Sequence, residues 1–313
     1  MRGMTIPWLA AGIAWLALGA LSPVSAAQQT PPQPLAISVV VTVKPKHGKD
    51  APEINHSEDI RAFEGLERLT VTAWTPLQGN QANLELLILL DEATGSSLAN
   101  KLVDVRKFIG GQPPTTTIAV GYIESGAVRM AQNFTTDHIA ASQALRVPQG
   151  VGAAGTSPYL SVTNVLKRWR GSNSRHAILL VTDGIDPLQR GVVDTYLDET
   201  IALAEQANTQ VSASYAARNG LASRIARMVD QGQNNLSNLA AATGGDAYFQ
   251  GHATPVSFAP TLDEFGARLA HQYLLTFSIR PQKKPSYRHI RLETELPNAD
   301  LVVADHVFVP AAE

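Results

Sequence analysis

Two stretches of this 313-residue chain limit its possible folds more than any others. The segments "LELLILLD" (84–91) and "HAILLVTD" (176–183) are nearly unbroken apolar runs, and each ends in an aspartate. A strand with one exposed face alternates apolar and polar residues, whereas a continuous apolar run is typical of a strand that is buried on both faces. The two stretches therefore predict a parallel sheet that is covered by helices on both sides.

Helical and strand-like patterns alternate around these two runs, which predicts an α/β domain over residues 80–272 with a mainly parallel central sheet. We expect Ser96 or Ser97 to cap the first helix, and Ser157 to cap another helix that has Pro158 at its first position. The predicted helices cover 96–109, 136–145, 158–169, 192–208, 234–245 and 261–272. The further strands of this domain are predicted at 116–123, 127–134, 210–216 and 246–249.

Strand-like segments rich in β-branched residues lie on both sides of the α/β region. Residues 27–79 hold a leader rich in Gln and Pro and an N-terminal β segment, and residues 273–313 hold a C-terminal β segment. The predicted strands lie at 35–43, 60–65, 68–76, 273–279, 289–296 and 301–309. We expect the two segments to pack together as one small accessory β module.

Residues 1–26 have the pattern of a secretory signal peptide. Arg2 precedes an apolar run from Ile6 to Leu21, and the small residues 24–26 fit a cleavage site. The alternative is a retained membrane anchor. It fits less well, because Ser22-Pro23 breaks a run that is already short for a bilayer span. We expect the chain to be exported to the periplasm or out of the cell.

The composition argues against several classes of function. There is no cysteine, which rules out disulfides, thiolate metal sites and cysteine nucleophiles. The formal net charge of -2 and an aromatic content of 6% provide no basic, aromatic surface for a nucleic acid. No H-E-x-x-H or G-x-S-x-G motif is present, so a hydrolase is poorly supported.

A glycine-rich stretch, "PQGVGAAGTSPY" (148–159), looks at first like a nucleotide site. It contains G-x-G-x-x-G, and it is one lysine short of a P-loop because Thr156 stands where the lysine would be. A dinucleotide fingerprint also requires a buried strand directly before it, and "ALRVPQ" is not one. A nucleotide-binding enzyme is therefore the weakest of our hypotheses.

A second interpretation of this stretch concerns the Thr156 hydroxyl. Ligands bind beyond the carboxyl ends of parallel strands, so Asp91, Asp183 and Thr156 meet there if the two apolar strands are neighbours. Such hard oxygen atoms suit Mg2+ or Mn2+. The alternative is structural: both carboxylates cap loop N–H groups and Thr156 makes a turn hydrogen bond.

Several segments, taken in order, resemble the von Willebrand factor A (VWFA) domain. They are "LLILLD", "VGYIESGAVRMAQNFTTD", "GTSPYLSVTNVL", "AILLVTDGID" and "LSNLAAATGGDAYF". The closing "HIRLETELPNADLVVADHVFVP" resembles a narrower group, the VWFA-related acidobacterial-type exported family. The resemblance implies a Rossmann-like fold and a metal-ion-dependent adhesion site, at which a partner's carboxylate completes the coordination of the metal.

Only part of that metal site is kept in this chain. The matching positions are Asp91, Thr156 and Asp183. The two serines of the family motif are replaced by Ala93 and Gly95, and Ser96 and Ser97 lie one and two places further on as substitutes. The sequence therefore predicts a degenerate site for Mg2+ or Mn2+.

From these observations we expect an exported, non-catalytic VWFA-like module that binds a protein partner, in the cell envelope or outside it. One alternative is a structural envelope component with a vestigial, metal-free site. The other is a hydrolase or nucleotide-binding enzyme.

Overall fold

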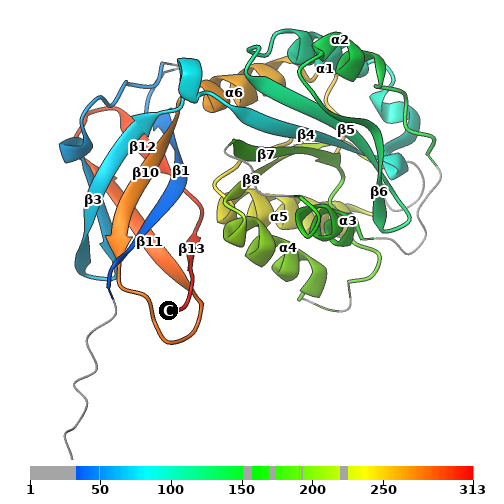
Figure 1. The fold of residues 1–313 in the computed structure, drawn as a ribbon. Coiled ribbons are helices and arrows are strands. Elements are labelled where there is room, and N and C mark those ends of the chain that lie inside the picture. The colour runs from blue at the N-terminus through cyan, green and yellow to red at the C-terminus, as the bar shows by residue number, and fades with distance from the viewer. Residues whose placement is uncertain are drawn as a thin grey trace, which may run out of the picture. The chain divides into compact units, whose positions relative to one another are not determined.

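In the computed structural model of the chain, strands β4 (Leu84–Asp91) and β7 (Arg175–Thr182) lie side by side in the middle of a six-stranded sheet (Figure 1). They run parallel with Leu90 opposite Val181, so that their carboxyl ends meet at one edge. The structure describes residues 33–48, 50–150, 157–169, 174–189, 191, 193–218 and 225–312.

The strand order of this sheet is β6-β5-β4-β7-β8-β9. Its other strands are β5 (Thr116–Glu124), β6 (Ala127–Thr135), β8 (Thr209–Tyr215) and β9 (Ala247–Tyr248). The edge strand β6 pairs antiparallel with β5, and the remaining pairings are parallel. This arrangement confirms the predicted α/β class with a mainly parallel sheet.

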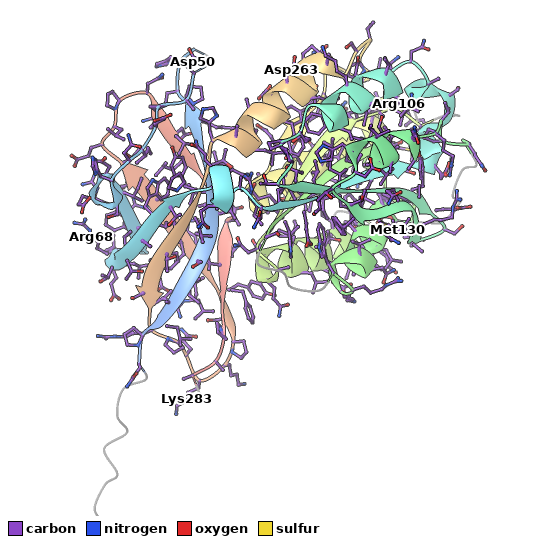
Figure 2. All side chains as sticks on the ribbon, turned by 45° about the horizontal axis from the view of Figure 1, so that its top comes forward. Asp50, Arg68, Arg106, Met130, Asp263 and Lys283 are labelled. Atoms are coloured by element: carbon purple, nitrogen blue, oxygen red, sulfur yellow. The ribbon has the colours of Figure 1, made fainter. Side chains whose placement is uncertain are left out.

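The apolar run of β4 serves two cores, one on each face of the sheet. Leu86, Ile88 and Leu90 pack with α1, α2 and α6, whereas Leu87 and Leu89 pack with α3, α4 and α5. Side chains fill the layers between sheet and helices (Figure 2). The helices on the first face are α1 (Leu102–Gly110), α2 (His138–Gln143) and α6 (Ala259–Ala270). Those on the second face are α3 (Pro158–Leu166), α4 (Thr195–Gln206) and α5 (Ala226–Ala242).

A second sheet of seven antiparallel strands has the order β12-β1-β10-β3-β2-β11-β13. The strands from the N-terminal segment are β1 (Leu35–Pro45), β2 (Ile60–Glu64) and β3 (Glu67–Pro76). Those from the C-terminal segment are β10 (Gln272–Ile279), β11 (Ser286–Thr294), β12 (Ala299–Val302) and β13 (His306–Val309). Strands from both ends of the chain therefore share one sheet, and it is larger than the small module we expected.

The single strand predicted at 301–309 is wrong, because the chain forms two strands there. β12 pairs with β1 and β13 pairs with β11, at opposite edges of the sheet. Between them the Asp305 N–H donates to the carbonyl of Ala242 at the end of α5, at 2.9 Å. Because that N–H is bonded to a helix end, the ladder is interrupted at this point.

The first predicted helix is also wrong in its start. Residues Glu92–Leu98 form 3-10 turns, and α1 begins only at Leu102, without a side-chain cap. Within Glu92–Leu98, Gly95 separates the two 3-10 turns at φ 54° and ψ -138°, a conformation open essentially to glycine alone. Neither Ser96 nor Ser97 is therefore the cap. By contrast, Ser157 does cap α3, since its Oγ accepts from the Leu160 N–H at 3.2 Å.

Helix α5 is longer than predicted, starting at Ala226 rather than at 234. At 17 residues it is also the longest helix that the structure describes. Within the described ranges, no helix combines the length and the hydropathy that crossing a membrane requires.

The contact of α5 with the end of β7 depends on Gly232. A Cβ added at Gly232 would lie 2.3 Å from the carbonyl oxygen of Asp183. Glycine-to-alanine changes inside helices usually stabilise by up to about 1 kcal/mol. Here the backbone clash reverses the sign, and we expect Gly232→Ala to lower the free energy of unfolding by about 1–3 kcal/mol in urea denaturation.

The matched control is Gly110→Ala at the end of α1, where an added Cβ meets no atom within 4 Å. We expect this variant to be as stable as the parent or more stable by up to about 1 kcal/mol. Equal effects of the two substitutions on the free energy of unfolding would show that the contact between Gly232 and the Asp183 carbonyl does not exclude a side chain at position 232.

Candidate functional site

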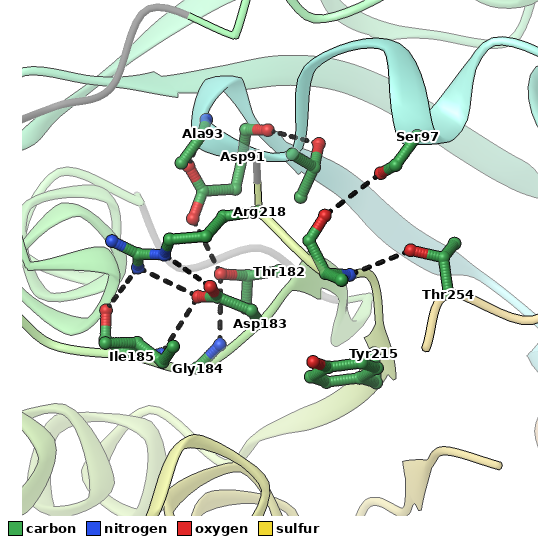
Figure 3. A network of polar contacts seen from close by, with 12 residues as sticks. Asp91, Ala93, Ser97, Thr182, Asp183, Gly184, Ile185, Tyr215, Arg218 and Thr254 are labelled. Atoms are coloured by element: carbon green, nitrogen blue, oxygen red, sulfur yellow. Dashed lines mark hydrogen bonds and ion pairs between the residues drawn. The ribbon is translucent and has the colours of Figure 1, made fainter. Parts of the chain in front are cut away.

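Asp91 ends β4 and is buried at the carboxyl edge of the sheet (Figure 3). Its Oδ1 accepts from the Ala93 N–H at 2.9 Å, and its Oδ2 accepts from the Thr182 hydroxyl at 2.6 Å. The Thr94 hydroxyl donates to the Asp91 carbonyl at 2.6 Å. Asp91 therefore holds the turn after β4 and ties the ends of β4 and β7 together.

The environment of Asp91 favours its neutral form. Burial, as the largest effect, raises the pKa of Asp91 from 3.8 to about 6. The negative charge of Asp183 acts in the same direction, while the Thr182 and Ala93 donors and the positive charge of Arg218 oppose it. The carboxyl thus ionises near pH 6, about two pH units above an exposed aspartate.

Asp183 follows β7 directly, and only 1% of its side chain is exposed. Its Oδ1 accepts from the Ile185 N–H at 3.0 Å and from Nη2 of Arg218 at 2.9 Å, and its Oδ2 accepts from Nε of Arg218. Nη2 also donates to the Ile185 carbonyl at 2.7 Å. The guanidinium therefore binds the carboxylate with two parallel hydrogen bonds, the strongest geometry for this pair.

Arg218 keeps its positive charge in this setting. Burial alone would lower the pKa of Arg218, but the hydrogen bonds and the charge of Asp183 outweigh burial and raise it. Its side chain is 15% exposed, and Nη1 has no hydrogen-bond partner among the described residues. We call Asp91, Thr182, Asp183 and Arg218 the arginine–aspartate cluster.

Two members of this cluster, Thr182 and Arg218, were not predicted as site residues from the sequence. Thr182 is the residue before Asp183, and Arg218 lies three residues beyond Tyr215, the end of β8. β8 pairs in parallel with β7, so its end lies at the same edge of the sheet. A charged residue soon after a parallel strand was therefore the available signal, although no motif marks it.

The remaining positions of the predicted metal site do not provide a ligand among the described residues. Thr156 lies outside those residues. Ala93, at the first serine position, donates its N–H to Asp91, and Gly95, at the second, has no side chain. Ser96 is exposed, and the Ser97 hydroxyl donates to the carbonyl of Ala217 at 3.1 Å. The Ala217 N–H in turn donates to the Thr254 hydroxyl at 2.9 Å, so that Ser97 and Thr254 brace the segment that carries Arg218.

The segment that leads into the glycine stretch is fixed beside the same edge. Glu92, next to Asp91, is buried and accepts from the Arg146 guanidinium and, at 2.6 Å, from the Gln149 N–H. The Gly150 N–H donates to the Glu92 carbonyl at 3.0 Å. The chain therefore enters residues 151–156 from a position close to β4.

The described donors do not fit a divalent cation at the arginine–aspartate cluster. Every carboxylate oxygen of Asp91 and Asp183 already accepts a hydrogen bond, and a cation on Asp183 would meet the Arg218 guanidinium. Among the described residues, no three His, Asp or Glu side chains are grouped so that they could hold a metal. What the cluster offers is Nη1 of Arg218, which donates to no described residue and suits an anionic group.

No protein-family model and no curated protein sequence matches the chain. Solved structures similar to it include an aerotolerance-related membrane protein of Bacteroides fragilis, with 14% identity over 59% of this chain and 98% of that one, at a TM-score of 0.41. The manganese-loaded TRAP protein of Plasmodium vivax aligns over 71% and 94% of the two chains, with 10% identity and a TM-score of 0.39. The ArnB paralog VWA2 of Sulfolobus acidocaldarius aligns over 88% and 76%, with 9% identity and a TM-score of 0.33. The fold described above rests on the strand order and packing of this chain itself.

The raised pKa of Asp91 predicts how pH affects stability. Between about pH 4 and 6, Asp91 is ionised in the unfolded chain but remains largely protonated in the folded chain. Its contribution to the free energy of unfolding therefore falls as pH rises. A shift of about two pKa units corresponds to about 3 kcal/mol. We expect the free energy of unfolding of Asp91→Asn, relative to the parent, to rise by about this amount from pH 4 to pH 7.

Glu92→Gln is the contrasting control in the same denaturation series. Burial opposes ionisation of Glu92, but the Arg146 and Gln149 donors outweigh it and lower the pKa of Glu92. Its stabilising contribution is therefore lost as pH falls. The free energy of unfolding of Glu92→Gln, relative to the parent, should accordingly fall as pH rises. A flat profile for Asp91→Asn would disprove the raised pKa.

Proposed function

We propose that this chain is an exported, non-catalytic VWFA-like binding module that engages a protein partner, in the cell envelope or outside it, at the carboxyl edge of its six-stranded sheet. The binding edge is metal-free, because Arg218 supplies the positive charge that a metal ion would bring. One observation carries the proposal, namely the two parallel hydrogen bonds between Arg218 and the buried Asp183.

Electrostatics supports a metal-free edge. Asp183 is almost fully buried, and a buried carboxylate without a counter-charge is costly. Arg218 supplies that counter-charge at hydrogen-bond distance, and its backbone is held by Ser97 and Thr254 through Ala217. A metal ion would have to displace a bonded guanidinium and would gain no serine hydroxyl from positions 93 and 95.

The chemistry of the partner follows from the free part of Arg218. Nη1 carries N–H groups without an acceptor among the described residues, and the side chain is partly exposed. A carboxylate on a partner protein is the complementary group for these donors. The partner surface we propose is therefore acidic at its centre.

Two other functions remain as the alternatives to a binding module. A structural envelope component would use the same fold with no partner at this edge. The other is a hydrolase or nucleotide-binding enzyme, and a nucleotide would have to bind at the glycine stretch, whose residues 151–156 lie outside the described ranges. Binding of ATP or NAD that is lost in Gly155→Ala would favour the enzyme over the module.

Arg218→Ala tests whether the arginine stands in for a metal. Removing one partner of a buried ion pair should lower the free energy of unfolding by about 3–5 kcal/mol in EDTA. The freed carboxylate of Asp183, with Asp91 near it, should then take up Mn2+, so that Arg218→Ala binds one Mn2+ more than the parent in calorimetric titration. The double variant Arg218→Ala/Asp183→Asn should regain stability and lose this additional Mn2+.

A parent protein that already binds Mn2+ at this cluster, as shown by loss of that binding in Asp91→Asn, would contradict the metal-free edge.

The binding role itself is tested by capture from envelope extract with the parent, Arg218→Ala and Arg168→Ala as baits. Arg168 is an exposed arginine of the segment after α3 and serves as the matched control. We expect one protein to be retained by the parent and Arg168→Ala in EDTA and lost with Arg218→Ala. Equal retention by all three baits would place the binding surface elsewhere.

A further inference from the structure

A cavity of about 760 Å³ lies at the amino edge of the six-stranded sheet, where the parallel strands begin. Its floor includes the first residues of three neighbouring strands, Leu84, Thr116 and Arg175. They form one row, because Leu84 is paired with Thr116 on one side and with Arg175 on the other. The C-terminal ends of α1 and α6 provide the walls. The cavity is therefore at the opposite end of the strands from the arginine–aspartate cluster.

Arg175 uses only half of its guanidinium in hydrogen bonds. Nη1 donates to the carbonyl of Leu269 in the last turn of α6, at 2.7 Å, and to Oε1 of Gln272. Nε is buried and has no partner, and Nη2 donates to no described residue. Nε and Nη2 are the same two atoms with which Arg218 binds Asp183. Arg175 thus has the donor pair that suits a carboxylate, with no acceptor from this part of the chain.

No acidic residue balances the charge of Arg175. Burial lowers the pKa of Arg175 from 12.5 to about 10, and no carboxylate acts against that effect. Outside the described residues the sequence contains one acidic residue, Glu313. The N–H of its neighbour Ala312 donates to the carbonyl of Gln282, which follows β10, whereas Gln272 beside Arg175 begins β10. A strand of 8 residues is about 25 Å long, so Glu313 is remote from the cavity.

A second polar group in the cavity also has no partner. The Thr115 hydroxyl is buried and makes no hydrogen bond, and Thr115 lines the same cavity as Arg175. Thr115 directly precedes β5, which lies two strands from β7, and two strand spacings are about 10 Å. The cavity lining contains no aspartate or glutamate. Much of the rest is apolar, including Leu77, Leu84, Pro113, Pro114 and Leu269.

We propose that this cavity binds a small carboxylic acid with an apolar body. The two carboxylate oxygens accept from Nε and Nη2 of Arg175, and the Thr115 hydroxyl donates to one of them. The apolar body lies against the leucine and proline side chains. A phosphate dianion fits less well, because one arginine among apolar walls does not balance two charges. The site is independent of the proposed function, whose residues lie at the other edge of the sheet.

Calorimetric titration of the full chain with sodium octanoate and with sodium benzoate tests the site. Octanol serves as the neutral counterpart of octanoate, and sodium phosphate as the competing class of anion. Arg175→Lys keeps the positive charge but loses the paired donors, and Thr115→Val keeps the shape of the side chain but loses the hydroxyl. The matched control is Arg106→Lys, since Nη2 of Arg106 donates to the carbonyl of Leu145 at 2.8 Å, outside the cavity.

We expect at least one of the two acids to bind the parent and Arg106→Lys with a dissociation constant below about 1 mM and to raise the Tm of both. Its affinity should be at least about tenfold lower for Arg175→Lys and about three- to tenfold lower for Thr115→Val. Octanol and phosphate should bind the parent at least about tenfold more weakly than the acid does.

The proposal fails if neither acid binds the parent, which would show that water satisfies the donors of Arg175. It also fails if Arg175→Lys binds the acid as the parent does. If circular dichroism shows that Arg175→Lys does not fold, Thr115→Val decides in its place. Octanol that binds as tightly as octanoate would show that the apolar walls alone account for binding. Phosphate that binds more tightly than either acid would overturn the carboxylate as the ligand.

Discussion

The parallel pairing of β4 with β7 is the constraint on which the rest of the carboxyl edge depends. Because each strand is apolar on both faces and ends in an aspartate, the pairing brings two buried carboxyl groups to one edge. Burying two acidic groups together is unfavourable unless one is neutral or is paired with a cation. Asp183 is paired with Arg218, and Asp91, whose pKa is raised to about 6, is neutral below that pH.

The supporting contacts around this edge all serve to keep that charge arrangement in place. Thr182 joins the ends of the two strands, and Ser97 and Thr254 fix the backbone next to Arg218. On the other face, α5 comes close enough that Gly232 lies against the carbonyl of Asp183. The charged residues of the edge are thus each held by several contacts, as the recognition surface that we propose would require.

Much of this fold could be predicted from the sequence because the signals were local. Unbroken apolar runs identified β4 and β7, and Ser157-Pro158 identified the start of α3. What could not be predicted depends on distant contacts. Two strands replace the one expected at 301–309, because each pairs with a different edge of the seven-stranded sheet.

The candidate site divides in the same way. Asp91 and Asp183 could be predicted as site residues because each ends an apolar strand. The role of Arg218 depends on β8 lying beside β7, and no local sequence pattern indicates that pairing.

The Arg218–Asp183 pair has one further consequence. A bound metal ion leaves when its concentration outside the protein falls, and chelators or competing ions can remove it. A guanidinium is part of the chain and stays charged throughout the physiological pH range. The positive charge beside Asp183 is therefore present from the moment the chain folds, at a fixed ratio of one per molecule, and it does not report on the ionic composition of the surroundings.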